Sequence, residues 1–209
     1  MGQVYAALDG RLREFVLGQP VYFVATAPSG SDGHVNVSPK GLSGTFAVLD
    51  ERRVAYLDYY GSGVETIAHL RDNGRIVLMF CAFSGPPKIV RLHGTGTAVF
   101  DGDAAFDGLW AAHFAGQERT GRLARCPTPA TRPVRGHGVR SIIVVEVSRI
   151  SDSCGYGVPL MTHVEDRDLL TRSHERKSAD DLAAYALTKN ATSVDGLPGL
   201  DAAAPARAG

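Results

Sequence analysis

The alternation of hydrophobic and polar residues predicts β-strands along most of the chain as far as residue 150. VYFVATA at 21–27 and HVNVS at 34–38 flank a PSGSDG turn, and TFAVL and VAYLDY form a second predicted hairpin within 45–59. RIVLMFCAF at 75–83 is apolar throughout, which is typical of a strand buried on both faces. The set is completed by KIVRLHGTGTAVF at 88–100 and SIIVVEVSRI at 141–150.

Apolar residues at helical spacing predict helices between these strands. Residues 9–17 carry such a face. A second helix is expected over residues 63–73, because Ser62 and Glu65 have the spacing of a capping box at its start. Strands in hairpin order with interspersed helices predict a mainly β fold, a six-stranded antiparallel barrel with peripheral helices. We expect one domain over residues 1–200 with a C-terminal helical extension, and a disordered tail over 201–209.

Composition and charge exclude several classes of function. Acidic and basic residues balance at 22 each, so no overall field recruits nucleic acid or an anionic membrane. The apolar runs are too short to span a bilayer, and the N-terminus lacks a secretory signal, so a cytoplasmic location is expected. Three widely spaced cysteines and no HExxH motif predict neither a disulfide framework nor a metal site.

The octapeptide HVNVSPKG, from His34 to Gly41, is the first candidate for chemistry. Pro39 has no amide hydrogen and is expected to end regular pairing, which leaves Ser38, Lys40 and Gly41 together at a strand end. A flat, phosphate-bearing ligand could use all three groups. The alternative is an ordinary strand closed by a Pro–Gly turn.

Two later segments also leave alternatives open. The loop 116–139 is rich in arginine and could hold phosphates or meet an acidic partner, or it could be a solvated loop. The segment CGYGVPLM at 154–161 could form a lid or platform over a flat ligand, or only a tight turn.

VYFVATAPSGSDGHVNVSPKG, LDYYGSGVETIAHLRDNGRIVLMF and KIVRLHGTGTAV, in this order and spacing, resemble the pyridoxamine 5'-phosphate oxidase-like superfamily over roughly residues 20–150. The C-terminal CGYGVPLM and KNATSVDGLPG resemble an uncharacterised subgroup of it. The resemblance implies a split β-barrel homodimer that binds flavin mononucleotide (FMN), or in some branches deazaflavin or haem, at the subunit interface. The sequence shows no nucleophile–base pair, and flavin sites of this kind need none, so no catalytic acid or base is named.

Transferred by position, the resemblance places Asn36, Val37, Ser38 and Lys40 along the flavin ring and ribityl chain. It places Tyr59 and Ser62 near the phosphate. Thr66 and Glu65 stand where relatives often carry basic phosphate ligands, and a carboxylate there would repel a phosphate, so Arg91 or the arginine loop would have to compensate.

Two functions follow as hypotheses. The first is an FMN-dependent oxidoreductase acting on a small molecule, because the flavin itself carries the redox chemistry. The second is a dimeric flavin- or haem-binding protein without turnover, or a deazaflavin-dependent reductase. Neither predicts nucleic acid or a membrane as a partner.

Overall fold

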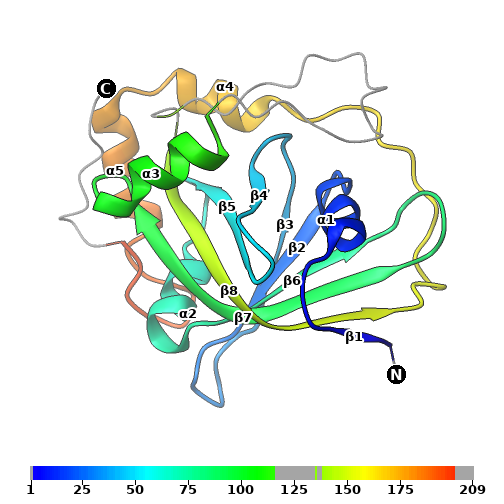
Figure 1. The fold of residues 1–209 in the computed structure, drawn as a ribbon. Helices are drawn as coiled ribbons and strands as arrows, with labels where there is room; N and C mark the ends of the chain where they lie inside the picture. The colour runs from blue at the N-terminus through cyan, green and yellow to red at the C-terminus, as the bar shows by residue number, and fades with distance from the viewer. Residues whose placement is uncertain (1, 116–134, 136–137, 201–209) are drawn as a thin grey trace.

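The computed structural model describes residues 2–115, 135 and 138–200. Its centre is an eight-stranded sheet in the order β3-β2-β6-β7-β8-β5-β4, with the short strand β1 added to β8 (Figure 1). Every ladder in this sheet is antiparallel. The strands are β1 (Val4–Tyr5), β2 (Tyr22–Thr26), β3 (Asn36–Lys40), β4 (Phe46–Val48), β5 (Arg53–Tyr59), β6 (Arg75–Cys81), β7 (Ile89–Phe100) and β8 (Val139–Ser153).

The sheet curls into a half-barrel whose inner face carries the main core. Alternate residues of β2 are buried, and cross-strand partners share a face, so the inner rows run through Tyr22 and Phe80 and through Val24 and Leu78. Aromatic rings fill the interior of the half-barrel between strand β2, near one edge of the sheet, and strands β4 and β5 at the other edge. Tyr22 lies 5.1 Å from Phe46 and 6.0 Å from Tyr56 between ring centroids. These contacts join β2 to β4 and β5, which share no ladder with it.

Five helices of the described chain lie around the sheet: α1 (Gly10–Leu17), α2 (Glu65–Asn73), α3 (Ala104–His113), α4 (Leu169–Glu175) and α5 (Ala179–Lys189). Asp9 caps α1, and Ser178 with Asp181 forms a full capping box on α5. α2 buries Ile67 and Leu70 in the main core. α3 packs Phe106 and Trp110 into a second core on the outer face of β5 and β8.

Two local predictions are wrong. The first helical residue of α2 is Glu65, with Val64 as its N-cap and no side-chain cap, so Ser62 and Glu65 do not form a capping box. Pro39 does not end β3 but lies inside it opposite Phe23. β3 is the end strand of the order, and proline is tolerated at a sheet edge because its missing amide hydrogen costs no ladder bond there.

The mainly β, antiparallel class with peripheral helices is confirmed. All seven predicted strand segments lie in the sheet, which has eight strands where a six-stranded barrel was expected. Part of the difference is β1, two residues long, which is too short for an alternation pattern to reveal. No helix within the described ranges has the length and apolar character needed to cross a bilayer. The predicted tail over 201–209 and most of the arginine-rich loop lie outside the described residues.

Candidate functional site

The inner side of β3 is polar and faces the start of α2. Asn36, Ser38 and Lys40 are half-buried and lie on one face, while the alternate residues Val37 and Pro39 are exposed. The Asn36 amide donates to Thr66 Oγ1 of α2 at 3.4 Å, and the Ser38 hydroxyl donates to Asn36 Oδ1 at 3.3 Å. Three of the predicted site residues, Asn36, Ser38 and Lys40, therefore form one polar strip on β3, and a fourth, Thr66, lies beside it on α2.

Lys40 ends this strip in a buried charge cluster that spans the gap between β3 and β5. Its ammonium group donates to Asp58 Oδ1 at 3.2 Å. Arg140 of β8 donates from Nε to Asp58 Oδ2 at 2.8 Å, and its second terminal nitrogen lies 2.7 Å from the same oxygen. Two cations thus share one carboxylate, and the group of three carries a net charge of about +1 at neutral pH.

The electrostatics of this cluster are set by burial and by its neighbours. Burial of Asp58 would raise its pKa, but the charges of Arg140 and Lys40 outweigh burial and hold the pKa below its ordinary value. The pKa of Tyr22 and of Tyr56 is raised well above its usual value, first by burial and then by the charge of Asp58. Both phenols stay protonated. The buried hydroxyl of Tyr22 has no hydrogen-bond partner within the described part of the chain, whereas the Tyr56 hydroxyl has Thr66 beside it.

The start of α2, where the resemblance places a phosphate, is covered by the chain's own C-terminal segment, defined here as residues 190–200. Both carboxylate oxygens of Glu65 accept from the Val194 amide at 3.2 Å. Val64 lies so close to Gly199 that a Cβ there would come within 2.5 Å of the Val64 side chain. Arg71 further along the helix donates to the Gly199 carbonyl.

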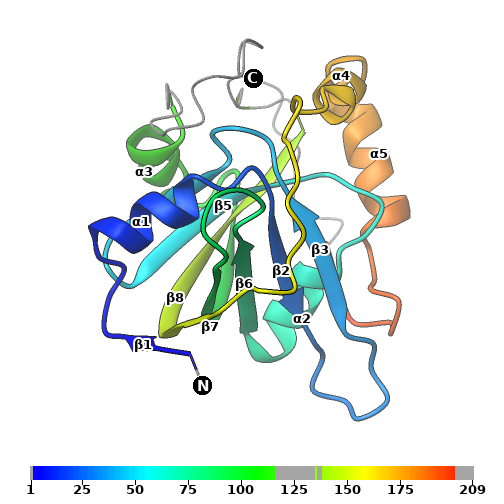
Figure 2. The same ribbon diagram turned by 90° about the vertical axis from the view of Figure 1, so that its right-hand side faces the viewer.

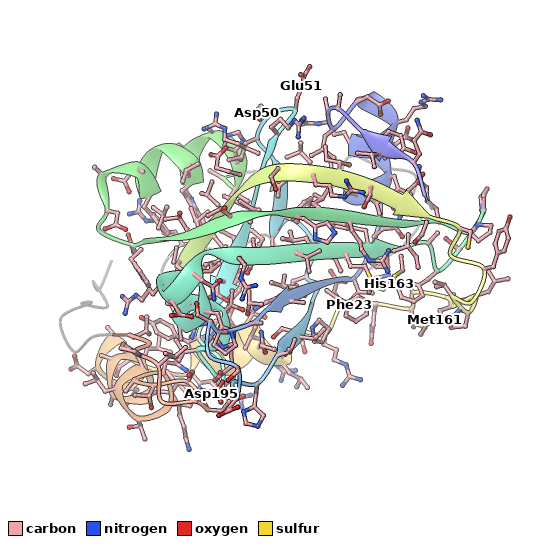
Figure 3. The ribbon with its side chains drawn as sticks, turned by 90° about the horizontal axis from the view of Figure 1, so that it is seen from below. Phe23, Asp50, Glu51, Met161, His163 and Asp195 are labelled. Carbon is pink, nitrogen blue, oxygen red and sulfur yellow. The ribbon has the colours of Figure 1, made fainter. Side chains whose placement is uncertain are left out.

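The C-terminal segment is anchored at its start and at its middle. Asn190 is fully buried, accepts from Arg140 at 3.0 Å and donates to the Gly61 carbonyl at 3.0 Å. Further on, Asp195 accepts from the backbone amide of His34 at 2.8 Å and lies 2.6 Å from its Nδ1. Figure 3 shows Asp195 at the side of the molecule opposite to the β4–β5 turn, which carries Asp50 and Glu51.

The remaining predicted site residues lie away from the polar strip. Val37 is 59% exposed on the outer face of the sheet. Arg91 shares that outer face, opposite Met79, and donates to Ser153 Oγ at 3.0 Å. Tyr59 stacks on His174 at 6.3 Å between ring centroids, and burial raises its pKa to about 12. Ser62 is exposed in the loop before α2.

Sequence reasoning missed Asp58, Arg140 and Asn190, which organise the site. Asp58 stands in the strand VAYLDY at a position of inward phase, and an acidic residue at such a position is the signal that could have identified it. Its partner Arg140 is 82 residues away in the chain, so no local pattern could pair them.

The two segments with open alternatives are resolved only in part. Arg135, from the arginine-rich loop, lies 2.8 Å from Asp101 and 2.7 Å from Asp107. Its charge is therefore paired with one carboxylate just before α3 and with one on α3. Residues 155–158 form a turn closed by a hydrogen bond of 2.9 Å from the Val158 amide to the Gly155 carbonyl, and Tyr156 is 83% exposed. Within the described residues no group of three or more histidine, cysteine or acidic side chains could hold a metal ion.

Comparison with solved structures finds likenesses of overall shape. HupZ from Group A Streptococcus is 18% identical with a TM-score of 0.45, over 73% of this chain and 97% of that one. An FAD-binding protein from Mesorhizobium loti is 16% identical with a TM-score of 0.41, over 73% of this chain and 96% of that one. At these values the likenesses carry no information about ligand or activity.

Sequence comparison is more decisive. The family model described as pyridoxamine 5'-phosphate oxidase matches residues 8–154. A pyridoxamine 5'-phosphate oxidase family protein, ustO of Aspergillus flavus, is 37% identical over 213 aligned residues, which cover 95% of this chain and 78% of that protein. The family match includes the polar strip on β3, the start of α2 and all of β8. The chain therefore belongs to the pyridoxamine 5'-phosphate oxidase family.

Proposed function

We propose that the protein is a flavin-dependent oxidoreductase of this family, with FMN as cofactor and a small organic molecule as substrate. The observation that carries the proposal is the polar strip of β3, which aligns an amide, a hydroxyl and an ammonium group beside Thr66. Such groups fit the heteroatom edge of a flavin ring and a ribityl chain, both of which need hydrogen-bond partners. The Tyr22 hydroxyl behind the strip has no hydrogen-bond partner within the described residues and is a further polar group that a bound ligand or water could satisfy.

The phosphate of the cofactor is better placed at Lys40 than at α2. The start of α2 presents the Glu65 carboxylate and the C-terminal segment, which together disfavour an added dianion. The cluster of Lys40, Arg140 and Asp58 carries a net positive charge, and the Lys40 side chain is 25% exposed. A bound phosphate would gain a charge-assisted hydrogen bond from Lys40, while Asp58, itself fixed by Arg140, holds the ammonium group in place.

A bound flavin supplies the electron-transfer chemistry itself. The chain's own residues bind and orient it. Asn36 and Ser38 are held in register by the β2–β3 ladder, and Thr66 is fixed by α2, so their polar atoms converge from two rigid elements. No catalytic acid or base is assigned.

We also propose a homodimer. The segment between β8 and α4, residues 154–168, crosses the sheet beside β6, β2 and β3 (Figure 2). It is fixed by a hydrogen bond from the Met161 amide to the Phe83 carbonyl and by one from the Ser43 amide to Asp166. Tyr156, Leu160 and Met161 on it are 83%, 79% and 59% exposed. An apolar surface of this kind is typical of a subunit interface.

A second candidate is a flavin- or haem-binding protein without turnover, or a deazaflavin-dependent reductase. The observation that favours these alternatives over an FMN-dependent enzyme is the covered start of α2, because this cover removes one expected binding site for the FMN phosphate. In that case the polar strip would serve binding alone or a different ring system.

The absorption spectrum of the purified protein tests these proposals, before and after anaerobic addition of a reduced nicotinamide. A flavin spectrum that bleaches supports the oxidoreductase. A Soret band supports haem binding, and a flavin spectrum that does not respond to any reductant supports binding without turnover. A colourless protein that takes up neither flavin nor haem contradicts the proposal.

A further inference from the structure

A separate cavity of about 370 Å³ lies at the outer face of the sheet. Its floor follows one cross-strand row from Ala25 of β2 through Val77 of β6 to His93 of β7. These residues belong to the opposite face of the sheet from Asn36, Ser38 and Lys40, because alternate residues of a strand point to opposite sides. The lining is completed by Thr26, Ala27, Val35, Arg75, Ile76, Gly94 and Ser148.

Small residues and a bulge create the hollow. Ala25 of β2 and Ala27, just beyond the end of β2, stand where larger side chains would fill the space. On β7 the register with β8 shifts between His93 and Gly94. A Cβ at Gly94 would lie 2.1 Å from the Glu146 carbonyl oxygen, so only glycine permits this close approach of β7 to β8. Bulges of this kind redirect neighbouring side chains, here His93 beside the cavity.

The charge of the cavity is positive. Arg75 is the charged residue of the lining, and the lining contains no aspartate or glutamate. The hydrogen bonds of Arg75 run from Nε to Asn73 Oδ1 and from a terminal nitrogen to the Pro28 carbonyl, both at 3.3 Å. Both acceptors are neutral, and within the described residues no carboxylate forms an ion pair with Arg75.

His93 adds a neutral polar group. Burial lowers the pKa of its imidazole, and the charges of Arg149 and Arg91 lower the pKa further. A neutral imidazole at physiological pH can donate or accept one hydrogen bond. Ser148 donates its hydroxyl to the His93 carbonyl at 3.2 Å, and its oxygen keeps acceptor capacity.

We propose that this cavity binds a small amphipathic carboxylate. The apolar body packs on Ala25, Val35 and Val77, and the carboxylate accepts hydrogen bonds from Arg75. The volume lies within the range of about 300–1,000 Å³ that is usual for small-molecule sites, as is a mostly apolar wall with a few polar groups. The inference goes beyond the proposed function, since binding at this face needs no flavin.

Calorimetric titration of the purified protein with indole-3-acetate and with indole-3-acetamide tests the proposal. The two probes have the same apolar body, but only the acetate carries a charge. We expect saturable binding of the acetate, about tenfold tighter than that of the amide, as a charge-assisted hydrogen bond implies. Equal affinity for the two probes, or no binding of either, would overturn the proposal.

Variants place the binding in this cavity. Arg75→Gln should remove the preference for the acetate, and Ala25→Leu should weaken both probes by filling the floor. Val35→Asp, at a position that is 70% exposed and therefore tolerant of substitution, should weaken the acetate more than the amide. Arg53→Gln on β5 is the matched control, and it should bind as the parent does. Unchanged acetate affinity in Arg75→Gln and Val35→Asp would place the binding elsewhere and refute the assignment. The flavin spectrum is an independent readout, so failure here leaves the cofactor proposal intact.

Discussion

Asp58 has a larger structural role than its single charge suggests. It is 1% exposed and accepts from Lys40 of β3 and from Arg140 of β8, so one carboxylate links these two strands to its own strand, β5. Removal of one partner from a buried ion pair leaves uncompensated charge in a medium of low dielectric. The cost of that change is set by burial more than by the number of bonds lost.

Asp58→Asn should therefore lower the free energy of unfolding by about 3–5 kcal/mol, because two cations would remain buried together. Urea denaturation monitored by circular dichroism measures the change. Asp50→Asn is the matched control, since Asp50 pairs with Arg53 at the surface and such pairs contribute about 0–1 kcal/mol. A loss no larger than that of the control would show that the cluster is not stabilised by its carboxylate.

The same carboxylate makes stability depend on acid. The pKa of Asp58 is lower in the folded protein than in the unfolded chain, so its contribution is fully present above the unfolded value of about 3.9. The contribution is lost as the pH falls through the lower folded pKa. We expect stability to fall below about pH 4 more steeply in the parent than in Asp58→Asn. Parallel curves of melting temperature against pH for the two proteins would contradict this.

Lys40 is the residue on which the placement of the flavin phosphate depends. Lys40→Ala should weaken FMN binding by about tenfold, the usual effect of one charge-assisted hydrogen bond. The fold should be less affected, because Arg140 still pairs with Asp58. Fluorescence titration with FMN and with riboflavin separates the phosphate from the ring. Lys88→Ala is a matched control, since Lys88 has similar exposure and also pairs with one aspartate, Asp152. Equal losses for both flavins would remove Lys40 from the phosphate site.

Among the elements, those with local signals were predicted and those that depend on distant contacts were not. Helix α5, part of the expected C-terminal helical extension, carries its capping box within four consecutive residues. The predicted box at Ser62 fails because Glu65 instead accepts from Val194, 129 residues away. The sequence of β3 alternates as expected, but its one valine, Val37, is exposed and its polar residues face inward. Period-two alternation locates a strand and does not say which face is covered.

The contact of His34 with Asp195 joins the β2–β3 hairpin to the C-terminal segment and responds to pH. Asp195 raises the pKa of His34 through a hydrogen bond and through its charge, and the bonds from His34 lower the pKa of Asp195. For a histidine with a raised folded pKa, the stabilisation is complete below the unfolded value of about 6.5 and is lost as the pH rises through the folded pKa.

We therefore expect the C-terminal segment to open more often above neutral pH. Hydrogen exchange, expressed as protection factors for residues 193–199, measures this opening. Asp195→Asn should lower the protection at pH 6 and remove most of its dependence on pH. Protection that is constant from pH 6 to pH 8.5 in the parent would show that the contact does not hold the segment. Residues of β6, far from the contact in the sheet core, serve as the internal reference.

For the whole molecule, the predicted class follows from composition and order alone. Antiparallel hairpins separated by short turns leave few topologies, and the family resemblance selects among them. The distribution of apolar surface does not follow in the same way. α3 covers the outer face of β5 and β8, whereas residues 154–168 cross beside β6, β2 and β3 with their own apolar side chains exposed. No local pattern distinguishes such residues from core residues, because exposure depends on what the rest of the chain leaves uncovered.

The last prediction concerns the assembly that would cover this surface. Light scattering at micromolar concentration should give twice the mass of one chain, because a closed two-fold pairing buries the same apolar patch on both copies. Leu160→Glu together with Met161→Glu should shift the protein to a monomer, since each charge would be buried at the interface without a partner. Leu187→Glu is the control, an exposed leucine on α5 that lies outside the segment and should leave the mass unchanged. A monomeric parent would contradict the dimer, and a dimeric double variant would place the interface on another face.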